Sequence, residues 1–361
     1  LDYETANERM GIPAPETFGS NAYSVGTDAS QINSGVLYGN PHFPWQGADR
    51  FYMSHLTIPG VYDAMGAGLH ALPGILIGYN KDVAWSHTVS TARRFTFDEL
   101  TLNADNPLEY IVDGEIRALE PATVSTENRN EDGSIETVEH TFYLSEYGPV
   151  VDPSPLNSAL GGWPNVFGTL FVYQDANLEN MRAIEYWLNV GQAGNIEEYK
   201  EASRLIGNPW ANSIAADRFG NAFYGDITVV PHVTQQKIDT CVRGPVSPLA
   251  LAQFRLIVLD GSDSSCNWGS DDDAPIEGIF GFDSLPSLDS GEYTANANDS
   301  YWLANPRNLL EGYSPIIGLE GVEQSIRTRL TFAQADQRLE GSDELGDAGF
   351  NNENIRQLLT G

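Results

Sequence analysis

The chain has 361 residues, and its 50 acidic and 19 basic side chains give a formal net charge of −31. This charge disfavours nucleic acids, anionic membranes and acidic macromolecules as partners, because each of them needs a basic face on the protein. Hydrophobic residues make up 41% of the chain, with 15 Phe, 16 Tyr and 7 Trp, which excludes a chain that stays unfolded. The length is sufficient for two domains or one large one.

Residues 1–19 are mostly polar and contain Gly11, Pro13 and Pro15, a pattern that predicts a spacer. After residue 19 the chain shows alternating strand patterns around turn residues, and apolar residues at helical spacing. These patterns predict, in chain order, a hairpin over 123–143, a helix over 196–206, a hairpin over 213–224, a helix over 325–339 and an exposed helical tail over 336–361. Strands that come first, with helices interspersed, favour an α+β protein over a parallel βαβ sheet.

The first residues of the chain include no initiator Met and no signal-peptide pattern. We therefore expect a processed or truncated piece of a longer product. No apolar run is long enough to span a bilayer, and we expect no membrane partner.

Two cysteines, Cys241 and Cys266, lack the paired spacing of a zinc site. They are either buried free thiols or a disulfide. A bond between them would close a loop of about 25 residues and stabilise the fold by about 3 kcal/mol. Since disulfides persist in oxidising compartments, we expect the bond together with a periplasmic or secreted location.

Several catalytic patterns are absent from the sequence, namely the GxSxG elbow, HExxH and GxxxxGK[ST]. The six histidines include no pair at i, i+4 spacing that could bind a metal. We therefore expect no cofactor and no metal. A serine such as Ser20, which follows a glycine in a loop, is by local chemistry alone a turn residue.

Eight short blocks of sequence change the interpretation of Ser20 from a turn residue to a candidate functional residue. They are residues 20–22, 40–45, 50–52, 55–60, 84–89, 175–180, 209–212 and 298–300. In their order and spacing, from residue 20 to about residue 335, the chain resembles the penicillin acylase family of N-terminal-nucleophile hydrolases, in particular its acyl-homoserine-lactone and aculeacin A acylases. The resemblance implies the four-layer αββα sandwich of these hydrolases.

The resemblance also implies a precursor that cleaves itself between Gly19 and Ser20. Ser20 would then supply both the nucleophilic hydroxyl and, through its free α-amine, the base, since an α-amine titrates near pH 8. Residues 20–361 would be the N-terminal part of a truncated large (β) subunit, whose partner is the small (α) subunit from the same precursor. While Gly19 remains attached, the nitrogen is an amide and cannot act as a base.

The family stabilises the oxyanion with one main-chain N–H and one Asn side chain. The matching positions are Val89 and Asn298, with Asn296 as the competing choice because it lies two residues away. His42 matches the residue that orients the α-amine. Arg327 matches an arginine that holds the Asn and the amine, and Arg329 is its competitor.

Three aromatic residues, Phe43, Trp187 and Trp210, match positions that line the family's acyl pocket together with Val89. His87 has no assigned role and is expected to be structural. The segment after Val89 lacks the acidic residues that bind calcium in some penicillin acylases, so no calcium is expected there.

The resemblance implies an enzyme that hydrolyses the amide of N-acyl-homoserine lactones to a fatty acid and homoserine lactone, and so quenches quorum signals. Lipopeptides and β-lactam side chains are alternative substrates. A different class of function is an unprocessed binding protein that keeps the pocket and never frees Ser20. An acidic extracellular β-protein would explain the composition but not the eight ordered blocks.

Overall fold

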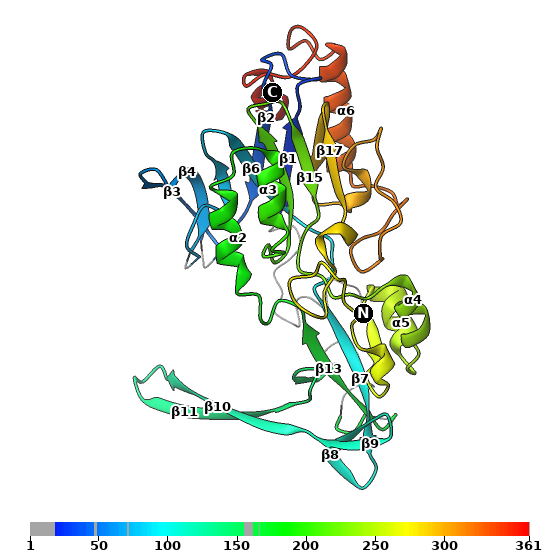
Figure 1. The fold of residues 1–361 in the computed structure, drawn as a ribbon. Coiled ribbons are helices and arrows are strands. Elements are labelled where there is room, and N and C mark those ends of the chain that lie inside the picture. The colour runs from blue at the N-terminus through cyan, green and yellow to red at the C-terminus, as the bar shows by residue number, and fades with distance from the viewer. Residues whose placement is uncertain (1–18, 47–48, 71, 155–161, 166, 361) are drawn as a thin grey trace. The chain divides into compact units, whose positions relative to one another are not determined.

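The computed structural model describes residues 19–46, 49–70, 72–154, 162–165 and 167–360 (Figure 1). Apart from Gly19, the predicted spacer lies outside these residues. The chain divides into two units, which are described one at a time. Of the described residues, the smaller unit takes 95–175 and 233–268, and the larger takes 19–94, 176–232 and 269–360.

Two antiparallel sheets form the centre of the larger unit. One has seven strands in the order β17-β15-β14-β6-β5-β4-β3, and the other has three in the order β18-β1-β2. The strands are β1 (Gly19–Val25), β2 (Val36–His42), β3 (Phe51–Ile58), β4 (Tyr62–Leu69), β5 (Ile77–Tyr79), β6 (Val83–Val89), β14 (Ala211–Asp217), β15 (Ala222–Gly225), β17 (Ser287–Ser290) and β18 (Tyr293–Asn296). The predicted hairpin over 213–224 is therefore β14 and β15.

The two sheets face each other, because β1 and β2 lie against β6. Strand β14 is buried at every position, as expected of a strand covered on both faces. Helices α2 (Arg182–Val190) and α3 (Ile196–Ser203) cover the seven-stranded sheet, and α6 (Ile326–Glu340) covers the three-stranded one (Figure 1). This gives the layer order αββα that the resemblance implies.

Both predicted helices form, and each begins at a side-chain cap. Asn195 accepts the main-chain N–H of Glu198 at 2.9 Å and starts α3. The side chain of Ser325 accepts the main-chain N–H of Thr328 at 3.2 Å and starts α6. Such caps satisfy main-chain donors that the first helical turn leaves without partners.

The expectation of an exposed tail over 336–361 is wrong. Phe350 is fully buried, and Ile355 and Leu358 of α7 (Asn354–Thr360) join the same apolar cluster. Arg338 is also fully buried and pairs with Asp343 at 2.9 Å. The apolar residues of this segment are few and widely spaced, but they converge on the face of the three-stranded sheet and bury apolar area there.

The smaller unit has a six-stranded sheet and a separate two-stranded ribbon. The sheet contains β7 (Phe95–Asn103), β8 (Asn106–Val112), β9 (Glu115–Ala118), β12 (Val150–Val151), β13 (Thr169–Asp175) and β16 (Val258–Asp260). The ribbon pairs β10 (Glu120–Arg129) with β11 (Ile135–Leu144), which is the predicted hairpin over 123–143. Helices α4 (Gln235–Cys241), α5 (Ser247–Phe254) and η3 (Ser264–Cys266) belong to the smaller unit, and the larger unit also has η4 (Phe282–Ser284) and η5 (Tyr301–Leu303).

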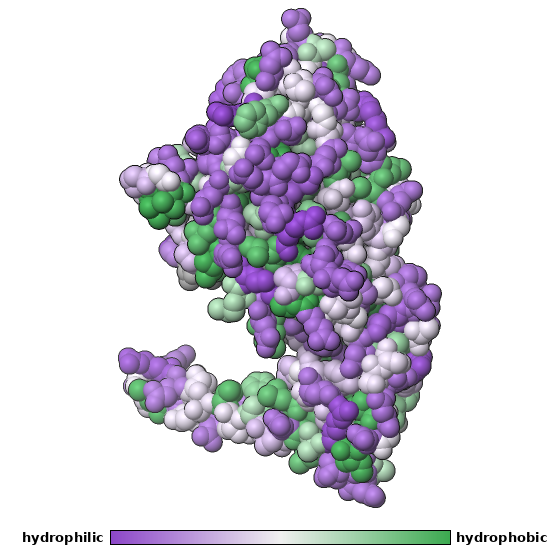
Figure 2. All heavy atoms as spheres, viewed as in Figure 1, coloured by the Kyte–Doolittle hydropathy of each residue, from purple (hydrophilic) through white to green (hydrophobic). Residues whose placement is uncertain are grey.

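The predicted disulfide is confirmed: Cys241 at the end of α4 is bonded to Cys266 in η3, with 5.5 Å between the two Cα atoms. Both cysteines are buried. Figure 2 shows a mainly hydrophilic face, as expected of a chain with 50 acidic residues. Among the described residues, no helix is long and apolar enough to cross a membrane.

Candidate active site

Ser20 lies at the start of β1, the central strand of the three-stranded sheet. Its side chain is buried, and in the strand pairing Ser20 lies opposite Pro41 of β2. The hydroxyl Oγ donates to the carbonyl oxygen of Gly19 at 2.5 Å. The expected nucleophile therefore touches the peptide unit that it is expected to attack.

Asn298 reaches Ser20 because β18 runs beside β1, with Asn296 opposite Ala22. Its Oδ1 accepts the main-chain N–H of Ser20 at 2.6 Å and Nη2 of Arg327 at 2.9 Å. Since both partners are donors, the amide oxygen is assigned and Nδ2 remains as the donor. Nδ2 lies 3.1 Å from the carbonyl oxygen of Val89. The two residues expected to stabilise an oxyanion are therefore neighbours.

Arg327 lies in the first turn of α6 and points at Ser20. It donates to the carbonyl oxygen of Ser20 and, at 2.8 Å, to Oδ1 of Asn21. Burial lowers the pKa of its guanidinium from the ordinary value. Arg329, two residues further along, is exposed and pairs with Glu323 at 3.4 Å. Of the two competing arginines, the structure brings only Arg327 to the site.

His42 ends β2 directly opposite Gly19. Its Nε2 lies 2.5 Å from Oδ1 of Asn40, so Nε2 carries the proton and Nδ1 is an acceptor. A Cβ on Gly19 would lie 3.1 Å from this Nδ1, so any larger side chain at position 19 would press on His42. Burial, and then the charge of Arg327, lower the pKa of His42 and favour the neutral ring.

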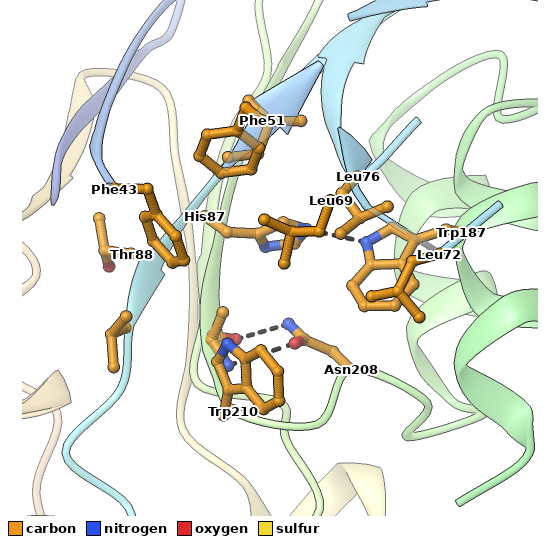
Figure 3. Close-up of a pocket in the computed structure, with 13 residues that line it drawn as sticks. Phe43, Phe51, Leu69, Leu72, Leu76, His87, Thr88, Trp187, Asn208 and Trp210 are labelled. Carbon is orange, nitrogen blue, oxygen red and sulfur yellow. Dashed lines mark hydrogen bonds between the residues drawn. The ribbon is translucent and has the colours of Figure 1, made fainter. Parts of the chain in front are cut away.

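An apolar pocket adjoins this group of residues, and Figure 3 shows its walls. It is lined by Phe43, Phe51, Leu69, Leu72, Leu76, Ile77, His87, Thr88, Val89, Trp187, Asn208, Trp210 and Ala211. The three aromatic residues expected in an acyl pocket are all in this set. Val89 belongs both to the pocket and to the group around Ser20, since it lines the pocket and its carbonyl oxygen accepts a hydrogen bond from Asn298.

His87 forms part of the pocket wall and is held there at both ring nitrogens. Its Nδ1 donates to the carbonyl oxygen of Asn212 at 3.0 Å, and its Nε2 accepts from Nε1 of Trp187 at 3.2 Å. Burial lowers its pKa to about 4, so the ring is neutral near pH 7. The wall therefore carries no charge at this position.

Sequence reasoning missed several of the pocket residues, including Leu69, Leu72, Leu76 and Asn208. The apolar run 72–78 is too short to span a membrane, and the sequence alone does not indicate that it lines a pocket. Asn208 holds the turn that presents Trp210: its Nδ2 donates to the carbonyl oxygen of Ala211, and its Oδ1 accepts the N–H of the same residue (Figure 3). Among the described residues, no group of three or more His, Cys, Asp or Glu is placed to hold a metal.

The penicillin amidase family matches residues 2–357 of the chain. Aculeacin-A acylase of Actinoplanes utahensis is 44% identical over 345 residues, which cover 95% of this chain and 42% of that protein. Acyl-homoserine lactone acylase PvdQ of Pseudomonas putida is 39% identical over 333 residues, which cover 91% of this chain and 40% of that protein. The chain thus spans about two fifths of the length of these relatives.

A solved structure shows the same fold. It is a thermostable penicillin G acylase from Alcaligenes faecalis, with a TM-score of 0.68, 20% identity, and coverage of 94% of this chain and 52% of that chain. This similarity confirms the expected α+β fold of N-terminal-nucleophile hydrolases. The family match over nearly the whole sequence and the identity to two acylases show that the chain belongs to the penicillin amidase family.

Proposed function

We propose that this chain carries the reaction centre of an N-acyl amide hydrolase that acts on N-acyl-homoserine lactones. The observation that carries the proposal is the position of Val89, which connects the group around Ser20 to the apolar pocket. An acyl chain in this pocket would place its carbonyl beside Val89 and Asn298. The activities named for the two relatives above support this reaction class.

Self-cleavage would come first. Ser20 Oγ, which lies 2.5 Å from the carbonyl oxygen of Gly19, attacks the carbon of that carbonyl. The C–N bond between Gly19 and Ser20 then breaks, the nitrogen takes up the hydroxyl proton, and an ester joins the Gly19 carbonyl to Oγ. Water hydrolyses the ester, which leaves a carboxylate on Gly19 and a free α-amine on Ser20.

The free α-amine then acts as the base of the reaction. It accepts the proton of Oγ as this oxygen attacks the acyl carbonyl, and it returns the proton to the departing nitrogen of homoserine lactone. Asn298 Nδ2 and the main-chain N–H of Val89 donate to the oxyanion. Loss of one such donor costs about 10²–10³ in rate. Water then releases the fatty acid from Ser20.

Arg327 and His42 would hold Ser20 and Asn298 in position. Arg327 binds Asn298 Oδ1 and the Ser20 carbonyl oxygen, and so turns Nδ2 of Asn298 away from itself. The neutral ring of His42 offers an acceptor, Nδ1, on the side of Gly19, where the amine forms. Both residues therefore act on the geometry of Ser20.

A lipopeptide is the second candidate substrate. The observation that favours it is the higher identity to aculeacin-A acylase, 44% against 39% for PvdQ. Both substrate classes present a fatty acyl amide, so the same pocket suits both. We further propose a small subunit from the same precursor as partner, and a periplasmic or secreted location, which the Cys241–Cys266 bond supports.

The test is hydrolysis of acyl-homoserine lactones of several chain lengths, and of an acylated lipopeptide, by the full-length gene product. We expect fatty acid release from the lactones, and no release by Ser20→Ala. Ser24→Ala is the matched control, because Ser24 is buried in the same strand and its hydroxyl contacts Thr294 at 2.6 Å, away from the site. Full activity of Ser20→Ala would contradict the proposal, and release from the lipopeptide alone would favour the second candidate.

A further inference from the structure

Asn296 is a buried residue whose side-chain oxygen and nitrogen both form hydrogen bonds within the protein. Its Oδ1 accepts Thr88 Oγ1 at 2.6 Å and the main-chain N–H of Asn298 at 2.8 Å. Its Nδ2 donates to the carbonyl oxygen of Asp299 at 3.0 Å. These three bonds fix the orientation of the Asn296 side chain, and none of them is to Ser20.

Asn298 has a left-handed backbone, with φ at +71°. Residues with a Cβ rarely adopt this conformation, and surrounding contacts must hold it in place. The two bonds from Asn296 act on both sides of Asn298, one on its own N–H and one on the carbonyl oxygen of Asp299. They form a clamp that turns the Asn298 side chain out of the strand direction and toward Ser20.

A second layer of buried groups fixes the orientation of Asn296. Tyr224 OH donates to Oδ1 of Asn212 at 2.8 Å, which assigns Nδ2 of Asn212 as the donor. This Nδ2 donates to Thr88 Oγ1 at 3.0 Å, so the Thr88 hydroxyl directs its own proton to Asn296. The exposed fractions of these four side chains are between 0% and 2%, so water does not compete for the bonds.

We infer that Asn296 is a positioning residue that holds Asn298 in its left-handed conformation, and that the chain Tyr224–Asn212–Thr88 sets the direction of its hydrogen bonds. The inference rests on the proposed function, in which Asn298 serves the oxyanion. It also connects substrate binding with catalysis, because Thr88 lines the apolar pocket and precedes Val89. Loss of the clamp would move the Asn298 amide, and a displacement of about 1 Å near a reaction centre can cost about 10²-fold in rate.

The experiment compares Asn296→Ala with Asn305→Ala in the full-length protein. Asn305 is a matched control because it is equally buried and makes the same kind of bonds: its Oδ1 accepts the N–H of Arg307, two residues later, at 2.8 Å, and its Nδ2 donates to the carbonyl oxygen of Tyr293 at 2.8 Å. It has no bond to Ser20 or Asn298. We expect Asn296→Ala to lower kcat about 10- to 100-fold with KM within about threefold. We expect the two variants to lower the unfolding temperature by similar amounts, and Asn305→Ala to leave kcat within about twofold of the wild-type value.

Two further variants keep the test decisive if Asn296→Ala folds poorly. Thr88→Val removes the hydroxyl at nearly constant volume and should lower kcat in the same direction, while Thr88→Ser should restore it. Equal losses of kcat in Asn296→Ala and Asn305→Ala would overturn the inference, as would an unchanged kcat in Thr88→Val.

A crystal structure of the Asn296→Ala protein separates this inference from the proposed function. We expect Asn298 to leave the left-handed region and its Oδ1 to lose contact with the Ser20 nitrogen. If Asn298 keeps φ near +71° and the 2.6 Å contact without the clamp, the inference is wrong. If the wild-type protein hydrolyses no acyl amide, the proposed function is wrong, and the backbone of Asn298 in this variant still decides the inference.

Discussion

The main-chain N–H of Ser20 donates to Oδ1 of Asn298 over 2.6 Å, although 278 positions of sequence separate the two residues. In the proposed mechanism this nitrogen is an amide before cleavage of the Gly19–Ser20 bond and an α-amine afterwards, and it can donate in both states. The same contact would then hold Asn298, the proposed oxyanion donor, beside Ser20, the proposed nucleophile, before and after self-cleavage.

Arg327→Ala should lower kcat/KM by at least about tenfold, because it removes the charged donor from Asn298 Oδ1 and from the Ser20 carbonyl oxygen. Arg329→Ala should leave kcat/KM within about twofold, since Arg329 is an exposed partner of Glu323. Steady-state kinetics of the two variants against one acyl amide make the comparison. Equal losses would show that the arginine assignment is wrong.

Trp210→Ala should weaken the selectivity for long acyl chains. The side chain lines the pocket and is 41% exposed, so part of its apolar surface is open to a ligand. If about two methylenes of a long chain lose their contact, kcat/KM for that chain falls about tenfold, since a buried methylene contributes about 0.8 kcal/mol. The value for a short chain stays nearly constant. The control is Trp45→Ala, because Trp45 is 95% exposed and does not line the pocket; a uniform loss over all chain lengths would argue against the acyl role.

His87 should make the fold less stable in acid. Burial lowers its pKa from 6.5 to about 4, so between these values the unfolded chain binds a proton that the folded chain does not. The contribution is complete above pH 6.5 and is lost as the pH falls toward 4, a difference of roughly 3 kcal/mol in the free energy of unfolding.

Urea unfolding at about pH 7.5 and about pH 4.5 tests this expectation, with His87→Gln as the reference. Burial raises the pKa of Asp98 to about 7 and that of Asp226 to about 6, which shifts stability in the opposite sense. These carboxyls act alike in both proteins, so the difference between them isolates His87. The same pH dependence in both proteins would rule out a neutral buried His87.

Replacement of Cys241 and Cys266 by Ser should lower the free energy of unfolding by about 3 kcal/mol, because the bond closes a loop of about 25 residues. Reduction of the wild-type protein should have the same effect and should not change the double variant. The bond lies in the smaller unit, while Ser20 lies in the larger one, so kcat at low temperature should be unchanged. Equal stability of oxidised and reduced wild-type protein would contradict this.

Much of the local structure could be predicted from the sequence, because it depends on neighbouring residues. Alternation predicted both hairpins, and apolar residues at helical spacing predicted helices α3 and α6. The set Ser20, His42, Asn298 and Arg327 came from the family resemblance and not from local chemistry, since four dispersed polar residues carry no periodicity. The structure brings these four together.

The remaining features depend on tertiary contacts. Asn296 and Asn298 would share a face in a regular strand, and only the left-handed turn at Asn298 sends their side chains to different partners. The pocket takes Leu69 and Leu76 from strands and loops whose neighbours the sequence does not reveal. The smaller unit combines residues 95–175 with 233–268, and no composition boundary marks this combination.

The most direct test of the central claim is the intact mass and N-terminal sequence of the large fragment of the full-length protein. We expect a fragment that begins at Ser20 in the wild-type protein, and an uncleaved Gly19–Ser20 bond in Ser20→Ala. A wild-type protein that hydrolyses acyl amides with this bond intact would contradict the claim that the α-amine of Ser20 is the base.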